Sequence, residues 1–185
     1  MLNDTKQKEI TRHFVACEIC DWVEAALMAI VCVVLLFTFV VRISDVDGAS
    51  MQPTLEHQDR LVITRVALGP GNGDIVVVTL PGGEIEPLVK RVIATEGQTI
   101  DINFETGQVF VDRQVLYEPY LEDLTHLPFD MTFPQTVPEG HFFMMGDNRN
   151  NSWDSRCMRI GMVDSRHVLG RAIFRVFPYN NIGVP

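Results

Sequence analysis

Leu88-Val89-Lys90-Arg91-Val92-Ile93-Ala94 is an apolar, largely β-branched run that carries two basic residues at its centre. Such a composition is typical of a buried β-strand. Further runs of this kind follow Arg60 and are separated by clusters of Gly, Pro, Asn and Thr, which favour turns. They cover residues 61–66, 75–79, 99–102, 109–111, 142–145 and 168–177. The sequence therefore predicts a mainly β domain.

The segment before these strands is different in kind. Residues 25–41, AALMAIVCVVLLFTFVV, are uncharged and predominantly apolar. With its apolar flanks the segment is long enough to span a bilayer, so we predict a transmembrane helix over residues 23–43. A buried core helix and a cleaved secretory signal are the alternatives. A core helix would keep a polar stripe and a cleaved signal would show a small-x-small site before Arg42, and the sequence has neither.

The predicted span divides the chain into parts. Residues 1–22 would be a cytoplasmic segment, and residues 44–185 an extracytoplasmic β domain with a small β insertion around residues 97–140. Basic residues precede the span but Arg42 follows it directly, so the positive-inside rule favours a cytoplasmic N-terminus only by a small margin. The expected location is a cell membrane crossed once, with the lipid bilayer as a partner.

Composition limits the classes of function. The chain has 185 residues and a net charge of -9, which fits one anchor and one globular domain of about 140 residues. A duplex nucleic-acid binder would normally carry a clustered basic face, and here Lys and Arg are scattered, so no nucleic-acid partner is expected. The domain has no His-Glu-x-x-His motif, paired Cys cluster or glycine-rich phosphate loop, so no metal or cofactor is expected.

Gly48-Ala49-Ser50-Met51-Gln52-Pro53-Thr54-Leu55 is a short loop that presents a hydroxyl between turn-forming residues. A serine hydroxyl is a weak nucleophile and needs a base within hydrogen-bond reach and donors for the oxyanion it generates. Gly48 allows the backbone to bend closely around a substrate, and Pro53 fixes the far side of the loop. An ordinary surface turn is the alternative.

Lys90 is the candidate base. A lysine is protonated at neutral pH and can accept a proton from serine only if burial lowers its pKa. In a strand, Lys90 shares a face with Leu88 and Val92 while Arg91 points to the other side, so Lys90 can face a core or groove. A surface lysine with a buried stem and a solvated ammonium is the alternative.

A dense polar loop follows the apolar run at residues 142–145. It reads Gly146-Asp147-Asn148-Arg149-Asn150-Asn151-Ser152-Trp153-Asp154-Ser155-Arg156. Its hydroxyl, carboxylate and guanidinium groups are suited to holding a buried lysine in place by hydrogen bonds. A solvated turn is the alternative.

In this order, the segments resemble those of type I signal peptidases, the membrane-bound Ser/Lys endopeptidases of family S26 that remove signal peptides from exported proteins. The resemblance covers most of the chain after the predicted span. It is carried by Ser50-Met51-x-Pro53-Thr54-Leu55, Gly73-Asp74-Ile75-Val76-Val77, Lys90-Arg91-Val92-Ile93-Ala94 and Gly146-Asp147-Asn148-Arg149-x-x-Ser152-x-Asp154-Ser155-Arg156. One span followed by a compact domain resembles the minimal, Gram-positive-like bacterial form.

The resemblance implies a role for each matched position. Ser50 would be the nucleophile, Lys90 the general base, and Ser152 a hydrogen-bond partner of the lysine. Structural and electrostatic support is implied for Asp147, Asp154, Arg156 and Arg91. Some members of the family have an oxyanion-assisting serine two positions before the nucleophile, where this chain has Gly48, so the Ser50 backbone N–H is the main expected donor.

The resemblance also implies the reaction. Signal peptides of exported preproteins would be cut after a small residue in an Ala-x-Ala-like pattern, on the outer face of the membrane and near the protein export channel. The substrate would bind as a strand added to a domain edge, with Met51 and Pro53 at the groove. For Met51, simple packing of the loop is the alternative.

Other functions remain open at this point. A self-cleaving Ser/Lys repressor would carry a DNA-binding head instead of a span, and a non-catalytic anchored module would merely retain the residues. A Ser/His/Asp hydrolase would use one of the histidines of the domain, which are His57, His126, His141 and His167. No Gly-x-Ser-x-Gly elbow is present, so these histidines are expected at the surface or in packing.

Overall fold

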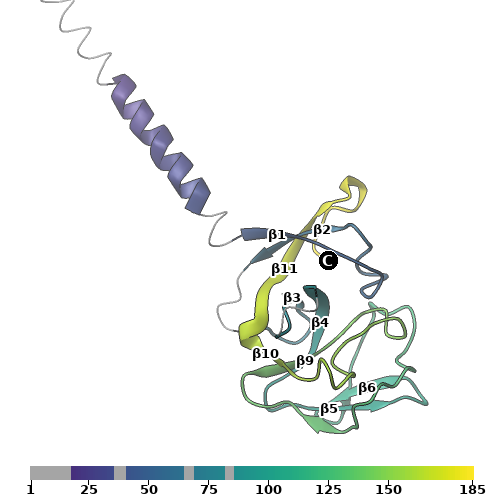
Figure 1. The fold of residues 1–185 in the computed structure, drawn as a ribbon. Helices are drawn as coiled ribbons and strands as arrows, with labels where there is room; N and C mark the ends of the chain where they lie inside the picture. The colour runs from purple at the N-terminus through teal and green to yellow at the C-terminus, as the bar shows by residue number, and fades with distance from the viewer. Residues whose placement is uncertain (1–17, 36–40, 65–68, 82–85) are drawn as a thin grey trace, which may run out of the picture. The chain divides into compact units, whose positions relative to one another are not determined.

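The computed structural model describes four stretches of the chain, residues 18–35, 41–64, 69–81 and 86–185. The chain divides into two compact units, Met1–Val41 and Arg42–Pro185. In the first unit, residues 18–35 form an α-helix that exposes its side chains along its whole length. The second unit holds the β-strands (Figure 1).

The helix differs from the predicted span. In residues 18–35, as in the other described stretches, no helix combines the length and the apolar character that crossing a membrane requires. The predicted end of the span is wrong, because strand β1 (Val41–Asp45) occupies the last residues of the expected 23–43 helix. Residues 1–17 and 36–40, which belong to the predicted N-terminal segment and span, lie outside the described residues.

Seven strands form the larger sheet, in the spatial order β1-β2-β11-β3-β4-β9-β10. After β1 these are β2 (Arg60–Thr64), β3 (Ile75–Val78), β4 (Leu88–Thr95), β9 (His141–Met145), β10 (Val163–Asp164) and β11 (Val168–Phe177). β4 pairs antiparallel with β3 on one side and β9 on the other. The strand that carries Lys90 is therefore central, which is the environment its apolar, β-branched composition predicts.

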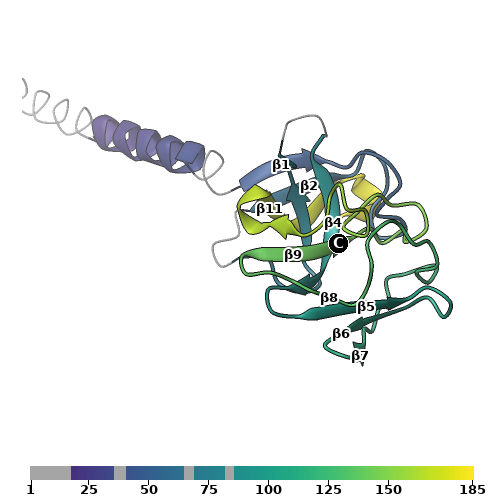
Figure 2. The same cartoon turned by 60° about the horizontal axis from the view of Figure 1, so that its bottom comes forward.

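A smaller sheet lies within the residues predicted as an insertion. It has the order β7-β6-β5-β8 and consists of β5 (Thr99–Asn103), β6 (Gln108–Val111), β7 (Gln114–Val115) and β8 (Gln135–Thr136). Figure 2 shows it below the larger sheet, at the end away from β1 and β2. Residues 116–134, which we call the 116–134 connection, join β7 to β8 without a strand or helix.

The mainly β prediction is confirmed, and the predicted strands agree with the observed ones within about one residue wherever the structure describes them. β1 was missed because its apolar residues continue the predicted span. β7, β8 and β10 were missed because two residues give no alternation to detect. Two short 3₁₀ helices, η1 (Ser165–His167) and η2 (Tyr179–Asn181), flank β11.

An apolar cluster joins the two sheets. Ile93 and Phe143 of the larger sheet pack with Ile100 and Val109 of the smaller one, and all four are buried. The ring of Phe133, on the 116–134 connection, packs edge-on against Phe143 with centroids 5.9 Å apart. The small sheet therefore shares a core with the strands that carry the candidate site.

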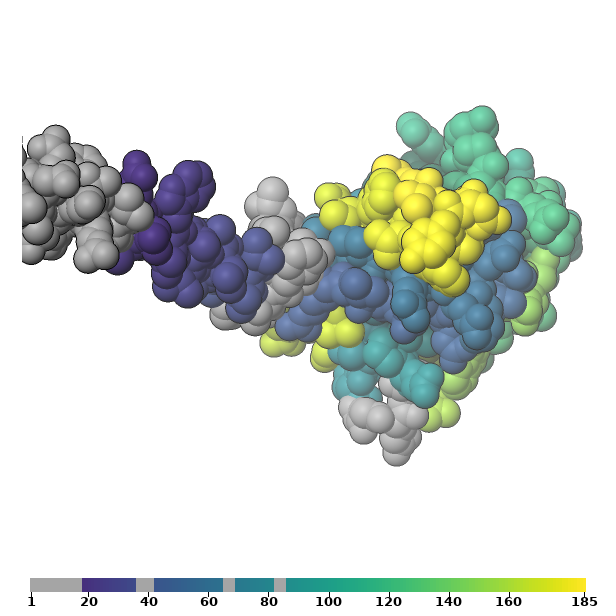
Figure 3. All heavy atoms as spheres, turned by 90° about the horizontal axis from the view of Figure 1, so that it is seen from above, coloured from purple at the N-terminus to yellow at the C-terminus, as the bar shows by residue number. Residues whose placement is uncertain are grey.

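The C-terminal residues are tied back to the domain. Arg175 of β11 donates from Nε to the Asn181 carbonyl at 2.7 Å, and its backbone pairs with Gly183. Its Nη1 reaches the Thr54 carbonyl at 3.0 Å. Figure 3 accordingly shows the C-terminal residues, in yellow, against the blue surface that follows β1. The end of the chain thus braces the segment that contains Ser50.

Candidate active site

The Ser50 loop, residues 48–55, runs between β1 and β2. Gly48 has a φ of +84°, a left-handed conformation that glycine adopts without strain. The Leu55 N–H donates to the Met51 carbonyl at 2.9 Å, and both side chains are buried in the core cluster below the loop. Met51 is only 1% exposed, so its position supports the packing alternative, while Pro53 is exposed. Core packing therefore fixes the loop that presents Ser50.

Lys90 lies beside Ser50. It is 3% exposed, and its Nζ donates to Ser50 Oγ at 2.6 Å and to the Val89 carbonyl at 3.1 Å. Burial disfavours the ammonium and lowers the pKa of Lys90 to about 8, against the opposing charges of Asp154 and Asp147. A neutral amine at this distance can take the proton of a hydroxyl.

The polar loop, residues 146–156, packs directly on the Ser50 loop. The Asn148 N–H donates to the Ser50 carbonyl at 3.0 Å. A Cβ on Gly146 would lie 2.3 Å from that carbonyl oxygen and 2.2 Å from Ser152 Oγ, distances that real side chains do not tolerate. The two loops approach this closely because Gly146 has no side chain.

Ser152 does not contact Lys90 as the resemblance implied. Its hydroxyl donates to Asp154 Oδ2 at 2.8 Å, and in the described residues Lys90 hydrogen-bonds only Ser50 and Val89. These contacts thus connect Ser152 to Asp154 and not to Lys90.

Asp154 is held in turn by Arg156. Arg156 Nε donates to Asp154 Oδ1 at 2.8 Å and Nη2 to Oδ2 at 2.9 Å, and both side chains are fully buried. The Gly146 N–H also donates to Asp154 Oδ2 at 3.1 Å. These bonds fix a negative charge near Lys90 and compensate it with a buried guanidinium.

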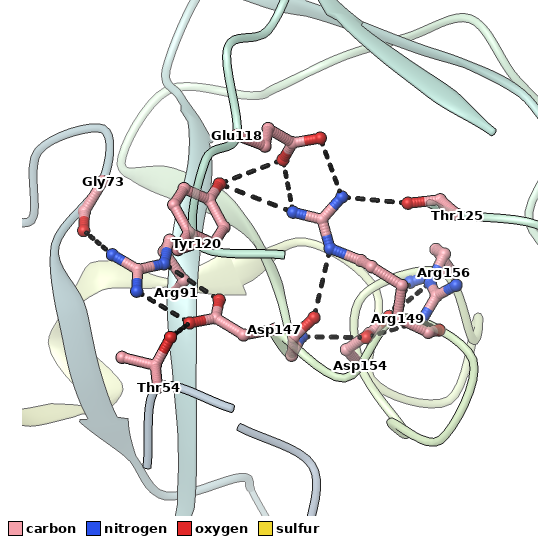
Figure 4. A network of polar contacts seen from close by, with 11 residues as sticks. Thr54, Gly73, Arg91, Glu118, Tyr120, Thr125, Asp147, Arg149, Asp154 and Arg156 are labelled. Atoms are coloured by element: carbon pink, nitrogen blue, oxygen red, sulfur yellow. Dashed lines mark hydrogen bonds and ion pairs between the residues drawn. The ribbon is translucent and has the colours of Figure 1, made fainter. Parts of the chain in front are cut away.

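A second arginine–carboxylate pair connects β4 with the Ser50 loop (Figure 4). Arg91 donates from Nε and Nη2 to the two oxygens of Asp147, at 2.9 and 2.7 Å, and from Nη1 to the Gly73 carbonyl at 3.0 Å. Thr54 Oγ1 donates to Asp147 Oδ2 at 2.5 Å. Asp147 therefore ties the strand of the lysine to the loop of the serine.

Two further buried arginines surround the site, and their partners were not predicted. Arg149 is 1% exposed, pairs through Nη1 and Nη2 with Glu118, and lies in the network of Figure 4. Arg175 donates to Asp59 Oδ2 at 2.9 Å besides its bond to Thr54. Glu118 lies in a segment without periodicity, and Asp59 lies in the polar run of residues 56–60, which resembles an ordinary solvated turn, so neither residue was singled out.

The backbone N–H of Ser50 is an open donor. Among the described residues the Ser50 N–H has no hydrogen-bond partner, whereas the Gly48 N–H donates to His57 Nδ1 at 3.2 Å. None of the histidines of the β unit hydrogen-bonds Ser50 in the described residues, which leaves no Ser/His pair there. Within the same residues, no group of three His, Cys, Asp or Glu side chains could hold a metal.

Comparison with known proteins identifies this arrangement. The family model described as signal peptidase, peptidase S26, matches residues 19–177. The chain belongs to the S26 family of signal peptidases. The match includes the Ser50 loop, β4 and the polar loop, and it confirms the family resemblance seen in the sequence.

Individual relatives agree with the family. The chain is 38% identical to the probable signal peptidase I-1 of Synechocystis sp. over 85% of this chain and 82% of the relative. It is 34% identical to a signal peptidase I of Bacillus amyloliquefaciens, over 88% and 90%. A crystal structure of a signal peptidase I from Enterococcus faecalis V583 is 27% identical, covers 55% of this chain and 95% of its own, and has a TM-score of 0.46. The chain is thus an enzyme of the S26 family, a serine endopeptidase of the type that removes signal peptides.

Replacing Gly146→Ala tests the close approach of the two loops. The added Cβ would overlap the Ser50 carbonyl and Ser152, so the Ser50 loop must move. We expect the rate of signal-peptide cleavage to fall about 100-fold, because a shift of about 1 Å misaligns reacting groups. Gly71→Ala is the matched control, since its Cβ would meet only Asp74 Oδ2 at an ordinary 3.6 Å. Equal rates in both variants would contradict the interpretation.

Proposed function

We propose that the enzyme cleaves signal peptides with Ser50 as nucleophile and Lys90 as general base. The 2.6 Å contact between Lys90 Nζ and Ser50 Oγ carries the proposal. In the ammonium form Nζ donates this hydrogen bond, and in the neutral form the hydroxyl donates it to Nζ. Only the neutral form can accept the proton, and the pKa of about 8 makes that form accessible near neutral pH.

The steps follow from this pair. Ser50 Oγ attacks the scissile carbonyl carbon while its proton passes to Lys90 Nζ. The resulting ammonium returns the proton to the leaving amine as the C–N bond breaks, and an acyl ester on Ser50 remains. The neutral amine then takes a proton from water, whose oxygen attacks the ester carbonyl. The ammonium returns that proton to Ser50 Oγ as the ester C–O bond breaks, which releases the carboxyl product and restores both residues.

The Ser50 N–H is proposed as the main donor to the oxyanion. It has no partner among the described residues and belongs to the nucleophile's own residue. The Gly48 N–H is engaged by His57, and Gly48 has no hydroxyl to offer. A preorganised donor of this kind stabilises the charge that develops on the carbonyl oxygen.

The substrate is proposed to bind as an added strand. β1 is an edge of the larger sheet and leads directly into the Ser50 loop, so a peptide beside it would run toward Ser50. Pro53 is exposed on the loop and available to such a peptide. We propose cleavage after small residues in an Ala-x-Ala-like pattern, on the ground of the family to which the chain belongs.

Membrane anchoring by the N-terminal unit is also proposed, with the β unit on the outer face near the export channel. The helix at residues 18–35 exposes large apolar side chains that water solvates poorly, among them Leu27, Val31 and Val34. The apolar run continues to residue 41 in the sequence. Lipid is a partner that would cover these side chains.

The pair itself is tested by Ser50→Ala and Lys90→Ala in the full chain. Each removes one reacting group, so signal-peptide cleavage of a preprotein in liposomes should fall by at least about 10³-fold while circular dichroism stays unchanged. His57→Ala is the control and should retain most activity. An active Lys90→Ala enzyme would show that the base lies elsewhere.

The pH dependence tests the state of Lys90. Its protonated form is inactive, so kcat/KM should rise with pH and reach half its maximum near pH 8. The Asp154 charge raises the pKa of Lys90. Asp154→Asn should therefore shift the rising part of the pH profile, the acid limb, to lower pH by about half a unit or more. Asp123→Asn, at an exposed carboxylate, should leave the profile in place. A limb that moves to higher pH in Asp154→Asn would contradict the proposal.

Anchoring is tested by flotation of the full chain with liposomes. A double variant, Val31→Arg with Val34→Arg, puts two guanidinium groups into the proposed membrane segment. Each arginine raises the free energy of membrane insertion by about 3 kcal/mol. The floating fraction should fall at least about tenfold. Val115→Arg, at an exposed valine of the small sheet, should float like the unaltered chain. Flotation of the double variant at the unaltered level would reject this anchor.

A further inference from the structure

Tyr120 lies against the arginine that supports the candidate site. The Arg91 guanidinium carbon is 4.0 Å from the centroid of the Tyr120 ring, which is close for a cation–π contact. Tyr120 belongs to the 116–134 connection, which has no strand or helix. Figure 4 shows the Tyr120 ring next to the Arg91 guanidinium.

Partly buried polar contacts link the connection around Tyr120 to the polar loop. The Tyr120 hydroxyl donates to Glu118 Oε1 at 3.0 Å and accepts from Arg149 Nη2 at 3.5 Å. Arg149 is bound on its other side to Thr125 Oγ1 at 2.9 Å and to the Gly146 carbonyl at 3.1 Å. The connection is thus held to the polar loop through Glu118 and Thr125, whose contacts with Arg149 do not depend on the Tyr120 hydroxyl.

Arg91 connects the Tyr120 ring to the surroundings of both Ser50 and Lys90. Its side chain orients Asp147, and Asp147 accepts the hydroxyl of Thr54 in the Ser50 loop. The neighbouring residue, Gly146, touches the Ser50 carbonyl. If the Arg91 side chain moved away from Asp147, the position of Ser50 and the electrostatic potential at Lys90 would both change.

Compensated charges surround Lys90. Asp147 and Asp154 on the polar loop both raise its pKa, and each is paired with a guanidinium. The charged groups that act on Lys90 are Asp147 and Asp154 of the polar loop, which are paired with Arg91 of β4 and with Arg156. Glu118 of the connection acts on Arg91, and the exposed His57 and Asp47 pair with each other beside the Ser50 loop. If water separated Arg91 from Asp147, the carboxylate would be less compensated and would favour the ammonium more strongly.

We propose that Tyr120 is a positioning residue for the reaction, and that its ring keeps the Arg91–Asp147 pair dry and aligned. Through this ring the connection of the small sheet controls the reacting pair although it contacts neither Ser50 nor Lys90. The inference rests on the proposed function of Ser50 and Lys90. It assigns the role to the ring and not to the hydroxyl, because it is the ring that covers Arg91.

The test compares Tyr120→Leu with Tyr120→Phe in the full chain, using a signal-peptide substrate in liposomes. Tyr120→Leu should lower kcat about tenfold with KM changed less than about twofold, because the loss concerns alignment and not substrate binding. It should also move the lower limb of the pH profile upward by about half a unit. Tyr120→Phe retains the ring and should restore both kcat and the limb. Tyr117→Leu, at an exposed tyrosine of the same connection, should behave like the unaltered enzyme.

Three results would overturn the inference. Tyr120→Leu could lower only the melting temperature and leave kcat and the pH limb in place, which would make the ring merely structural. Tyr120→Phe could be as impaired as Tyr120→Leu, which would assign the effect to the hydroxyl. A higher KM at unchanged kcat would assign Tyr120 to substrate binding. Ser50→Ala and Lys90→Ala are measured alongside, and activity in either one would reject the proposed pair independently of Tyr120.

Discussion

The hydrogen bond of 2.6 Å between Lys90 Nζ and Ser50 Oγ joins a central strand to a loop forty positions earlier in the chain. Burying an ammonium carries a large desolvation penalty, and burying a neutral amine carries a much smaller one. The surrounding protein must therefore exclude water from Lys90 without adding so much negative charge that the ammonium returns. The pKa of about 8 reflects that balance, since burial acts against two nearby carboxylates.

The carboxylates are tolerable because each has a buried arginine. Asp154 is paired with Arg156 and Asp147 with Arg91, in bidentate geometry that fixes both position and charge. Such pairs add little net stability relative to apolar packing, but removing one partner leaves a buried charge at a cost of about 3–5 kcal/mol. The role of these pairs is to hold the polar loop in position. The loop has no backbone hydrogen bonds of a sheet to hold it, and the charge-assisted bonds fix it instead.

The sequence was sufficient for much of the fold. β4 and β11 were predictable because β-branched runs between turn residues produce strands wherever both faces are buried. Ser50 and Lys90 were selected by the resemblance of several segments in order, because a serine in a turn or a lysine in an apolar strand is by itself compatible with an ordinary structural role. β1 was not predictable as a strand, since its residues continue an apolar run and only pairing with β2 separates it from the helix.

Contacts that depend on tertiary placement were beyond the sequence. Ser152 was expected on Lys90, but its hydroxyl donates a charge-assisted hydrogen bond to the carboxylate of Asp154. Glu118 and Tyr120 carry no signal of their own, because the 116–134 connection has no period from which a buried face can be read.

The small sheet is held to the larger one in two chemically different ways. Phe133 and Phe143 belong to an apolar core that fixes how closely the sheets approach but says little about the orientation of any single polar group. Glu118 and Tyr120 supply directional contacts to Arg149 and Arg91, and these tolerate only small displacements. Since close-packed cores shift as units, any movement of the small sheet carries the directional contacts with it. The connection is therefore a structural part of the site and not a linker that happens to pass it.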